Sequence, residues 1–434
     1  MACRRGVAPM TSARDAPARY ERSTSGPRPA PERERAMTLL ASDAARDAHD
    51  EPLRGARSRP GTGAVALRWL GVAVAAAALW STLRGADLPS VAALIASVSA
   101  PMMALALVPN LVARLFQAEA SRRVFDTHTH THTRTRTRNP ASGRPAPFSR
   151  YLALTLSTEA LSMSVPAGAA LSESVTFYLL HRWCGIPGPQ GVAGIAARRA
   201  LIVLANAAYV AIALALGFGH LERASRPLIG GPGLPWLVVL SGLGLLVVAL
   251  ALGGALFSGT VASRVFAWLK RLPGQRVKAY VDARAAAFSA TDRHAAALGE
   301  RRAALAAAAL LLLGMWLAEG AETYLFLRLL GVDVSLSEVL SFEVVLALLR
   351  AAAFMVPAGL GVQDAGYVAF LTALGVPAAA TVGAAFVLIK RAKELVWIAL
   401  GLLVFFGGRA AFRPAPAPMA GSEATRGRDG VVTR

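Results

Sequence analysis

The motif Val-Pro-Ala-Gly occurs twice in this chain, at 165–168 and at 356–359, and each copy interrupts an apolar stretch. Pro cannot continue a helix, because it lacks an N–H donor and its ring clashes with the preceding turn. Non-helical backbone at membrane depth is tolerated only where protein or a water-filled cavity covers it. We therefore predict two broken helical hairpins, with breaks at Pro166, Gly168, Pro357, Gly359 and Gly361.

The similarity around the motif extends along both halves of the chain. In each half an acidic residue follows the Gly by five positions, then a Gly-hydrophobic-Pro triplet, then a basic doublet inside an apolar run. The acids are Glu173 and Asp364, and the doublets are Arg198-Arg199 and Lys390-Arg391. Matching interruptions in two halves indicate a substrate path between repeats. We predict repeat 1 at about 101–218 and repeat 2 at about 303–408.

Composition agrees with a membrane protein. Hydrophobic residues make up 55% of the chain and its mean hydropathy is +0.47, which is unusual for a soluble domain of this length. Several segments reach the roughly 20 apolar residues that a bilayer requires. They are Ala64–Leu83, Val192–Phe218, Leu234–Phe257, Ala303–Leu330 and Ala378–Phe406, with a weaker one at Pro101–Gln117. The predicted fold class is therefore an all-α polytopic membrane protein, built from two inverted repeats.

The net charge of +20 resides mainly outside these segments. We predict a disordered basic leader at 1–62, with Met37 as a second candidate start, a transmembrane domain at 63–408 and a disordered tail at 409–434. The loop 127–147 is a Thr-His and Thr-Arg expansion, which we interpret as solvated rather than as a metal site. No cofactor, metal site or disulfide is expected, and bases confined to tails and loops do not favour nucleic acid as a partner.

The distribution of bases also predicts an orientation. Arg and Lys gather in the leader, near 122–150, in the loop 264–302 and in the tail, and the positive-inside rule places these four segments in the cytoplasm. For the loop 264–302 to be cytoplasmic, the segment Tyr151–Trp183 must enter the membrane from the cytoplasm and return to the same side. Its two arms have about 15 residues each. A helix of that length is roughly 22 Å long, which is too short to cross the hydrocarbon core of a bilayer, about 30 Å thick. Glu338–Leu374 is then a second hairpin entered from outside, and both termini are cytoplasmic.

The loop 259–302 has an amphipathic pattern, with Phe266, Trp268 and Tyr280 among basic residues. One interpretation is a helix pair lying on an anionic cytoplasmic leaflet. The alternative is a solvated helical loop packed on the bundle.

The second half resembles a known family. Arg350-Ala-Ala-Ala-Phe-Met-Val-Pro-Ala-Gly-Leu-Gly-Val-Gln-Asp-Ala-Gly-Tyr367, then Leu374-Gly-Val-Pro377 and Lys390-Arg-Ala-Lys-Glu-Leu395, is similar to the C-terminal signature of the lysylphosphatidylglycerol synthase transmembrane-region family. Within it, the half is most similar to the hopanoid-biosynthesis-associated HpnL-type members, from which Ser164–Ala170 departs. The resemblance implies a polytopic bacterial inner-membrane protein of flippase-like type, with lipid translocation as its expected activity.

We expect no enzymatic activity. Full-length aminoacyl-phosphatidylglycerol synthases carry a soluble transferase domain after the membrane region, and this sequence contains 26 residues after the predicted transmembrane domain at 63–408. No nucleophile elbow, zinc-protease motif or phosphate-binding loop occurs in its required context.

Ionisable residues inside the apolar regions are the candidate site, because each costs at least about 2.5–3.5 kcal/mol there unless it is paired or hydrated. The twelve candidates are Glu159, Glu173, Arg198, Arg199, Glu319, Glu322, Glu343, Arg350, Asp364, Lys390, Arg391 and Glu394. One interpretation is a hydrated groove, where Arg199 and Arg391 keep their charge for a lipid phosphate. The other is a set of internal salt bridges. Glu319 and Glu322 share a helix face and could couple protons, or bridge to Arg328 or Arg350.

These observations predict a protein that moves, or helps to move, a polar lipid, either an anionic phospholipid or a modified lipid. The alternative is a non-transporting membrane partner that docks a lipid-modifying or hopanoid-pathway enzyme on its basic cytoplasmic face.

Overall fold

The computed structural model describes residue 80 and residues 87–126, 146–164, 168–352 and 361–412, all within one unit, Val65–Arg434. Regular secondary structure in these ranges is entirely helical, which confirms the predicted all-α class. The leader, the first predicted span apart from residue 80, the loop from 127 to 145 and the tail from 413 lie outside the described residues.

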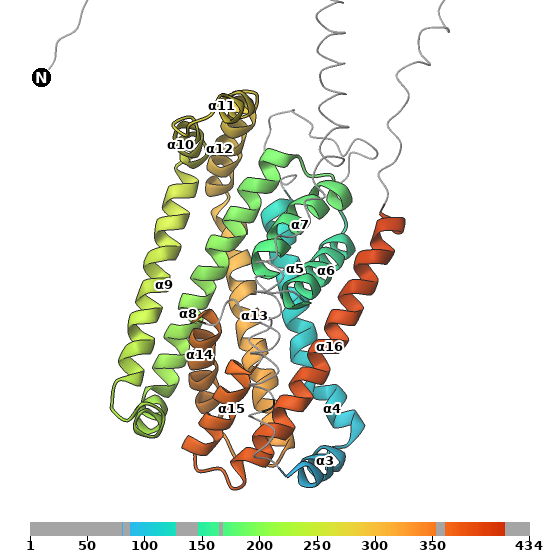
Figure 1. Cartoon of the computed structure of the whole chain (residues 1–434), viewed down its shortest axis with the longest axis vertical. Helices are drawn as coiled ribbons and strands as arrows, with labels where there is room; N and C mark the ends of the chain where they lie inside the picture. Colours follow the sequence, from blue (N-terminus) through green and yellow to red (C-terminus); the bar gives the residue numbers. More distant parts are fainter. Residues whose placement is uncertain (1–79, 81–86, 127–145, 165–167, 353–360, 413–434) are drawn as a thin grey trace, which may run out of the picture. The chain divides into compact units, whose positions relative to one another are not determined.

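The helices form a bundle whose labels are those of Figure 1. They are α3 (Leu88–Ser97), α4 (Ala100–Ala106), α5 (Val108–Phe125), α6 (Phe148–Ser164), α7 (Gly168–Cys184), α8 (Gly188–Ile229), α9 (Leu234–Phe257), α10 (Val261–Leu269), α11 (Gln275–Asp282), α12 (Ala285–Glu300), α13 (Arg302–Leu329), α14 (Leu336–Ala352), α15 (Val362–Ala373) and α16 (Ala379–Ala411). Several of them, including α3, α5, α8 and α9, have Pro in their first turn, where the missing N–H removes no helical hydrogen bond.

Four described segments are long and apolar enough to cross a bilayer: Ala100–Phe125, α8, α9 and α13. The chain is therefore a multi-pass membrane protein. The segment 101–117, predicted as the weakest span, belongs to the first of the four. Helix α16 has 33 residues and is also long enough, but its middle carries Lys390, Arg391, Lys393 and Glu394.

Both predicted broken hairpins appear as helix pairs, α6 with α7 and α14 with α15, and in each pair the two helices pack together. The second helix of each pair ends at a Gly in the left-handed region, Gly185 and Gly375, each with φ of +70°. The N–H after each Gly returns to a carbonyl of the helix, at 3.2 Å in the first pair and 3.0 Å in the second. The repeated Gly-hydrophobic-Pro triplet thus ends both hairpins in a similar way.

Each hairpin packs against the long helix of the other half, because α6 contacts α16 and α14 contacts α8. Figure 1 shows the two hairpins toward opposite ends of the bundle. The contacts are close because glycines lie at them: a Cβ at Gly401 would overlap the Leu156 carbonyl, and one at Gly217 would overlap Ser341. Small residues let helix backbones approach each other in membranes.

Helix α8 is kinked at Gly217, where φ is −134° and ψ is 16°. Its 42 residues would extend about 63 Å if straight, about twice the thickness of a bilayer core. The Ser341 hydroxyl of α14 donates to the Gly217 carbonyl at 3.3 Å. The same hydroxyl lies closer to the Ser337 carbonyl of its own helix, at 2.8 Å, so its one proton is shared between α14 and the kink.

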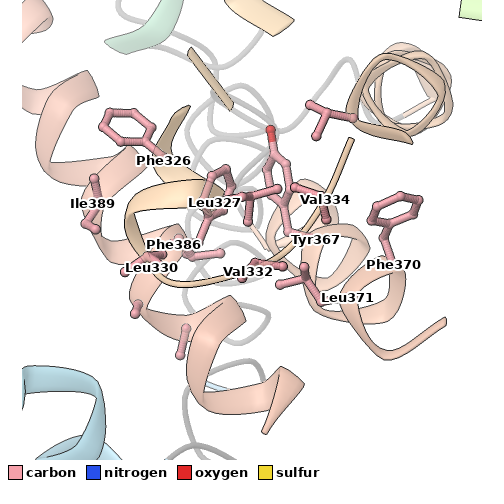
Figure 2. Packing of buried hydrophobic residues seen from close by; sticks show 14 of the residues in the cluster. Phe326, Leu327, Leu330, Val332, Val334, Tyr367, Phe370, Leu371, Phe386 and Ile389 are labelled. Atoms are coloured by element: carbon pink, nitrogen blue, oxygen red, sulfur yellow. The ribbon is translucent and has the colours of Figure 1, made fainter. Parts of the chain in front are cut away.

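The largest apolar cluster joins α13 to the second hairpin and α16. Figure 2 shows residues of this cluster, with Phe326 of α13 and Phe370 of α15 on opposite sides of Tyr367, and the ring of Phe326 packs against Phe386 of α16. The rings of Tyr367 and Phe386 lie 4.7 Å apart in an edge-to-face arrangement. This packing fixes the Tyr367 ring while its hydroxyl reaches the polar residues described next.

Candidate functional site

Three of the charged residues predicted as the site, Glu159, Glu319 and Glu322, lie where α5, α6, α13 and α16 come together, and the others form separate pairs described below. Arg114 of α5 lies at the centre, with only 7% of its side chain exposed. One of its terminal nitrogens is 3.1 Å from Glu159 of α6, and the other is 3.4 Å from Glu319 of α13. A single guanidinium therefore joins the first hairpin to a spanning helix of the second half.

Glu322 lies one turn along α13 but pairs with a different base. Its carboxylate is 2.5 Å from Lys393 of α16 and accepts a hydrogen bond from Asn110 of α5 at 3.4 Å. All three side chains are buried. The predicted shared face of Glu319 and Glu322 is present, yet each acid has its own basic partner.

Among the described residues, Glu319 and Glu322 form no salt bridge with Arg328 or Arg350, which were the predicted partners. Arg328 pairs instead with Asp333 at the exposed end of α13. The sequence reasoning missed Arg114 and Lys393. Arg114 lies in the segment predicted as the weakest span, and Lys393 follows the repeated doublet but has no basic counterpart in the first half, where Ala200, Leu201 and Ile202 follow the doublet.

Asp364 links the second hairpin to α16. Its carboxylate accepts the Gly361 N–H at 2.8 Å, where the backbone has φ of +79°, and it lies 2.5 Å from Arg391. Arg391 is also 2.5 Å from Glu394, one turn further along α16. The acid thus caps α15 after the break and holds α15 to α16.

Arg391 was expected, in the groove interpretation, to keep a charge that no protein carboxylate fully neutralises. In the structure two carboxylates flank its guanidinium, which favours the salt-bridge interpretation for this residue. Arg199 forms a bridge with Glu173 of α7, but Arg198 shares that one carboxylate, so the predicted role of Arg199 stays a prediction. Arg198 is 3.8 Å from the same acid and donates to Ser121 at 3.4 Å.

The acid and the second base of the doublet therefore pair in both halves, Glu173 with Arg199 and Asp364 with Arg391. The two pairs differ in burial: 42% of the Arg199 side chain is exposed, against 13% for Arg391. A repeated pair in equivalent positions, with both partners in the same half, is the pattern of an internal lock between hairpin and helix.

A third group surrounds Glu343 of α14. Its carboxylate accepts hydrogen bonds from Thr323 at 2.6 Å and from the Tyr367 hydroxyl at 3.1 Å. Lys390 of α16 lies 3.4 Å away and also contacts the Tyr367 hydroxyl. Neither Thr323 nor Tyr367 was predicted, and their polar atoms became candidates only once packing placed them beside Glu343.

Arg350 differs from the other bases. It lies in the last turn of α14, just before the second break, and is partly exposed. Among the described residues it makes no salt bridge, and its Nε is buried with no hydrogen-bond partner.

Adding Arg114 and Lys393 to the twelve predicted residues gives a balanced set of seven acids and seven bases. The acids are Glu159, Glu173, Glu319, Glu322, Glu343, Asp364 and Glu394, and the bases are Arg114, Arg198, Arg199, Arg350, Lys390, Arg391 and Lys393. Such balance lowers the cost of holding charges inside a bilayer. It also means that the network attracts no ligand by net charge alone.

Two of the predicted breaks are in the described residues. A Cβ at Gly168 would overlap the Ser162 carbonyl of α6, so the close approach there requires glycine. Gly361 has the positive φ that glycine adopts most readily. Pro166, Pro357 and Gly359 lie outside the described residues. Where the chain is described, no group of three or more His, Cys, Asp or Glu side chains could hold a metal ion.

Comparison with known families gives one match. Residues 68–403 match the family described as "Lysylphosphatidylglycerol synthase TM region". No curated protein matches the chain. The matched range includes both hairpins, α8, the part of α16 up to residue 403 and all fourteen of the charged residues named above.

Proposed function

The chain belongs to the lysylphosphatidylglycerol synthase TM region family, and from this premise we propose that it is a flippase-like protein that translocates or handles a polar lipid. The proposal places it in the bacterial inner membrane with both termini in the cytoplasm, and its two halves as inverted repeats. A lipid with a phosphate or another polar head group is the proposed ligand, and no catalytic role is proposed.

The proposal rests on one observation: acidic and basic side chains from both halves of the chain meet inside the helix bundle. Glu159 of the first hairpin and Glu319 of α13 share Arg114, and 27% of each carboxylate side chain stays exposed. An exposed carboxylate facing hydrocarbon would be very costly, so these groups require water or a polar head group beside them. That is the environment a transported head group needs.

Arg350 is the base best suited to hold a phosphate. Its guanidinium forms no salt bridge with a described residue, and a planar fork of donors matches phosphate geometry. Its position beside the second break places it where a hairpin could move. The buried pairs of Arg391 and Lys393 instead lock helices together, so this proposal replaces the predicted role of Arg391.

A second candidate function is the docking of a lipid-modifying enzyme, including one of a hopanoid pathway. The observation that favours it is the exposed, basic surface of α10 to α12. The two candidates differ in which residues matter: transport depends on Arg350 and the Glu159–Arg114–Glu319 group, whereas docking depends on the bases of 264–302.

The test is lipid analysis of each leaflet in a strain lacking the gene, complemented with parent, Arg350→Gln or Arg328→Gln. Arg328 is the matched control, since it is an exposed arginine paired with Asp333 at a helix end. We expect Arg350→Gln to be present at normal level but to restore less than a tenth of the parental lipid asymmetry, and Arg328→Gln to restore it fully. Full restoration by Arg350→Gln would refute the assigned phosphate site.

A further inference from the structure

The segment 261–300 forms three short helices directly after a spanning helix. Helix α9 is a run of 24 residues without a charge, and it ends at Phe257. Gly259, with φ of +67°, turns the chain, and α10 begins at Val261. Because only three residues separate α10 from an uncharged span, α10 must lie close to the membrane–water boundary.

Helix α10 is held firmly to α12. Asp292 of α12 accepts the backbone N–H groups of Ala262 and Ser263 at 2.8 Å each, which caps the first turn of α10. On the inner side of α10, Phe266 packs against Phe288 with ring centres 5.4 Å apart. Helix α12 in turn packs against α8 and α9, so the three-helix segment is anchored to the bundle. Figure 1 shows α10 to α12 at the end of α9.

The outer face of α10 combines exposed apolar and basic side chains. Arg264, Val265 and Trp268 share a face of α10 away from Phe266, and 59% of Trp268 is exposed. The exposed Arg271 follows in the turn after the helix. Tyr280 of α11 is equally exposed, and the Arg284 guanidinium lies 3.6 Å from its ring centre. Aromatic rings interleaved with Arg and Lys are the composition of helices that lie in the plane of a membrane interface.

The charge of this surface is strongly positive. Six Lys and Arg side chains are exposed in 261–300, against two exposed acids, Asp282 and Glu300. Asp282 is already paired with Lys270 at 2.9 Å. Burial, together with the neighbouring Arg293, lowers the pKa of His294, so the positive charge near pH 7 comes from Lys and Arg.

We propose that α10 to α12 form a binding surface for the anionic head groups of the leaflet at which α9 ends, with Trp268 and Val265 inserted between lipids and Arg264 and Arg271 on phosphates. The occupant is the membrane itself because the anchoring of α10 holds its outer face at the boundary. The inference is independent of lipid transport, and it assigns the basic surface a ligand other than a docked enzyme. It also makes the position of α9 and α8 sensitive to the lipid composition of one leaflet.

The test uses the full chain in nanodiscs of phosphatidylcholine, with and without phosphatidylglycerol, and lipids brominated near the head group. The quenching difference between parent and Trp268→Phe isolates the Trp268 signal. We expect Trp268 emission to shift to shorter wavelength and to be quenched at least twofold more in anionic discs. The double variant Arg264→Gln/Arg271→Gln should return both readings to the neutral-disc values. Salt at 1 M should weaken the effect, because it screens electrostatic attraction between charges more than about 3 Å apart.

Arg328→Gln serves as control, because its arginine is at the far end of α13, about 40 Å from the residue that follows α12. It should leave both readings unchanged. Equal Trp268 emission in neutral and anionic discs, without quenching by brominated lipid, would overturn the proposal and leave a solvated face.

Discussion

Removing the charge of Arg391 should unfold the second half of the protein rather than abolish a binding event. The guanidinium lies 2.5 Å from both Asp364 and Glu394, and 2% of the Asp364 side chain is exposed. Arg391→Gln leaves Asp364 buried without its base, although Asp364 still accepts the Gly361 N–H. Breaking a buried pair in this way costs about 3–5 kcal/mol. That is roughly two to four orders of magnitude in the folding equilibrium.

The assay is the folded fraction of full-length protein after detergent extraction, followed by size-exclusion chromatography and thermal unfolding. Arg391→Gln should be depleted strongly, and Arg391→Gln/Asp364→Asn should recover much of the folded fraction, because asparagine can still accept the cap hydrogen bond without a buried charge. Arg199→Gln is the matched control from the first half. Its arginine is 42% exposed, so it should destabilise much less. Normal folding of Arg391→Gln with complete loss of function would refute the lock and return Arg391 to the ligand site.

Two further predictions concern packing and topology. Gly401→Leu should prevent α16 from packing on α6, because even a Cβ would overlap the Leu156 carbonyl, whereas Gly244→Leu on α9 meets open space and should be tolerated; equal amounts of folded protein from both variants would argue against this helix contact. In a cysteine-free background, cysteine at Gly188 should be labelled from the cytoplasm and cysteine at Asp333 from outside. Labelling of both positions from one side would contradict the inverted hairpins.

Much of the fold follows from local sequence. The interrupted apolar stretches predict α6 with α7 and α14 with α15, and the repeated Gly-hydrophobic-Pro triplets appear as similar helix ends at Gly185 and Gly375. These features depend on a few adjacent residues, whose conformational limits are strong. The repeat of an acid followed by a basic doublet could likewise be recognised in both halves from the sequence alone.

The partners across the bundle could not be predicted in the same way. Glu319 and Glu322 do share a face of α13, but α5 and α16 contribute the bases Arg114 and Lys393 from 205 and 71 residues away. Helical spacing fixes which side chains share a face and leaves open which helix packs against it. Tyr367 shows the same limit, because its hydroxyl became part of the polar network only through the packing of its ring with Phe386.

The central claim is that the charged network serves the passage of a lipid head group, and transbilayer movement in proteoliposomes tests it most directly. Purified protein would be reconstituted with lipids labelled on the head group, and the fraction protected from an external quencher would be followed with time. We expect parent protein to accelerate the movement of a phosphate-bearing polar lipid at least tenfold over protein-free vesicles. Arg350→Gln should reduce this movement to near background, and Arg328→Gln should not. Equal rates for protein-free vesicles, parent protein and Arg350→Gln, across anionic, zwitterionic and aminoacylated head groups, would contradict it.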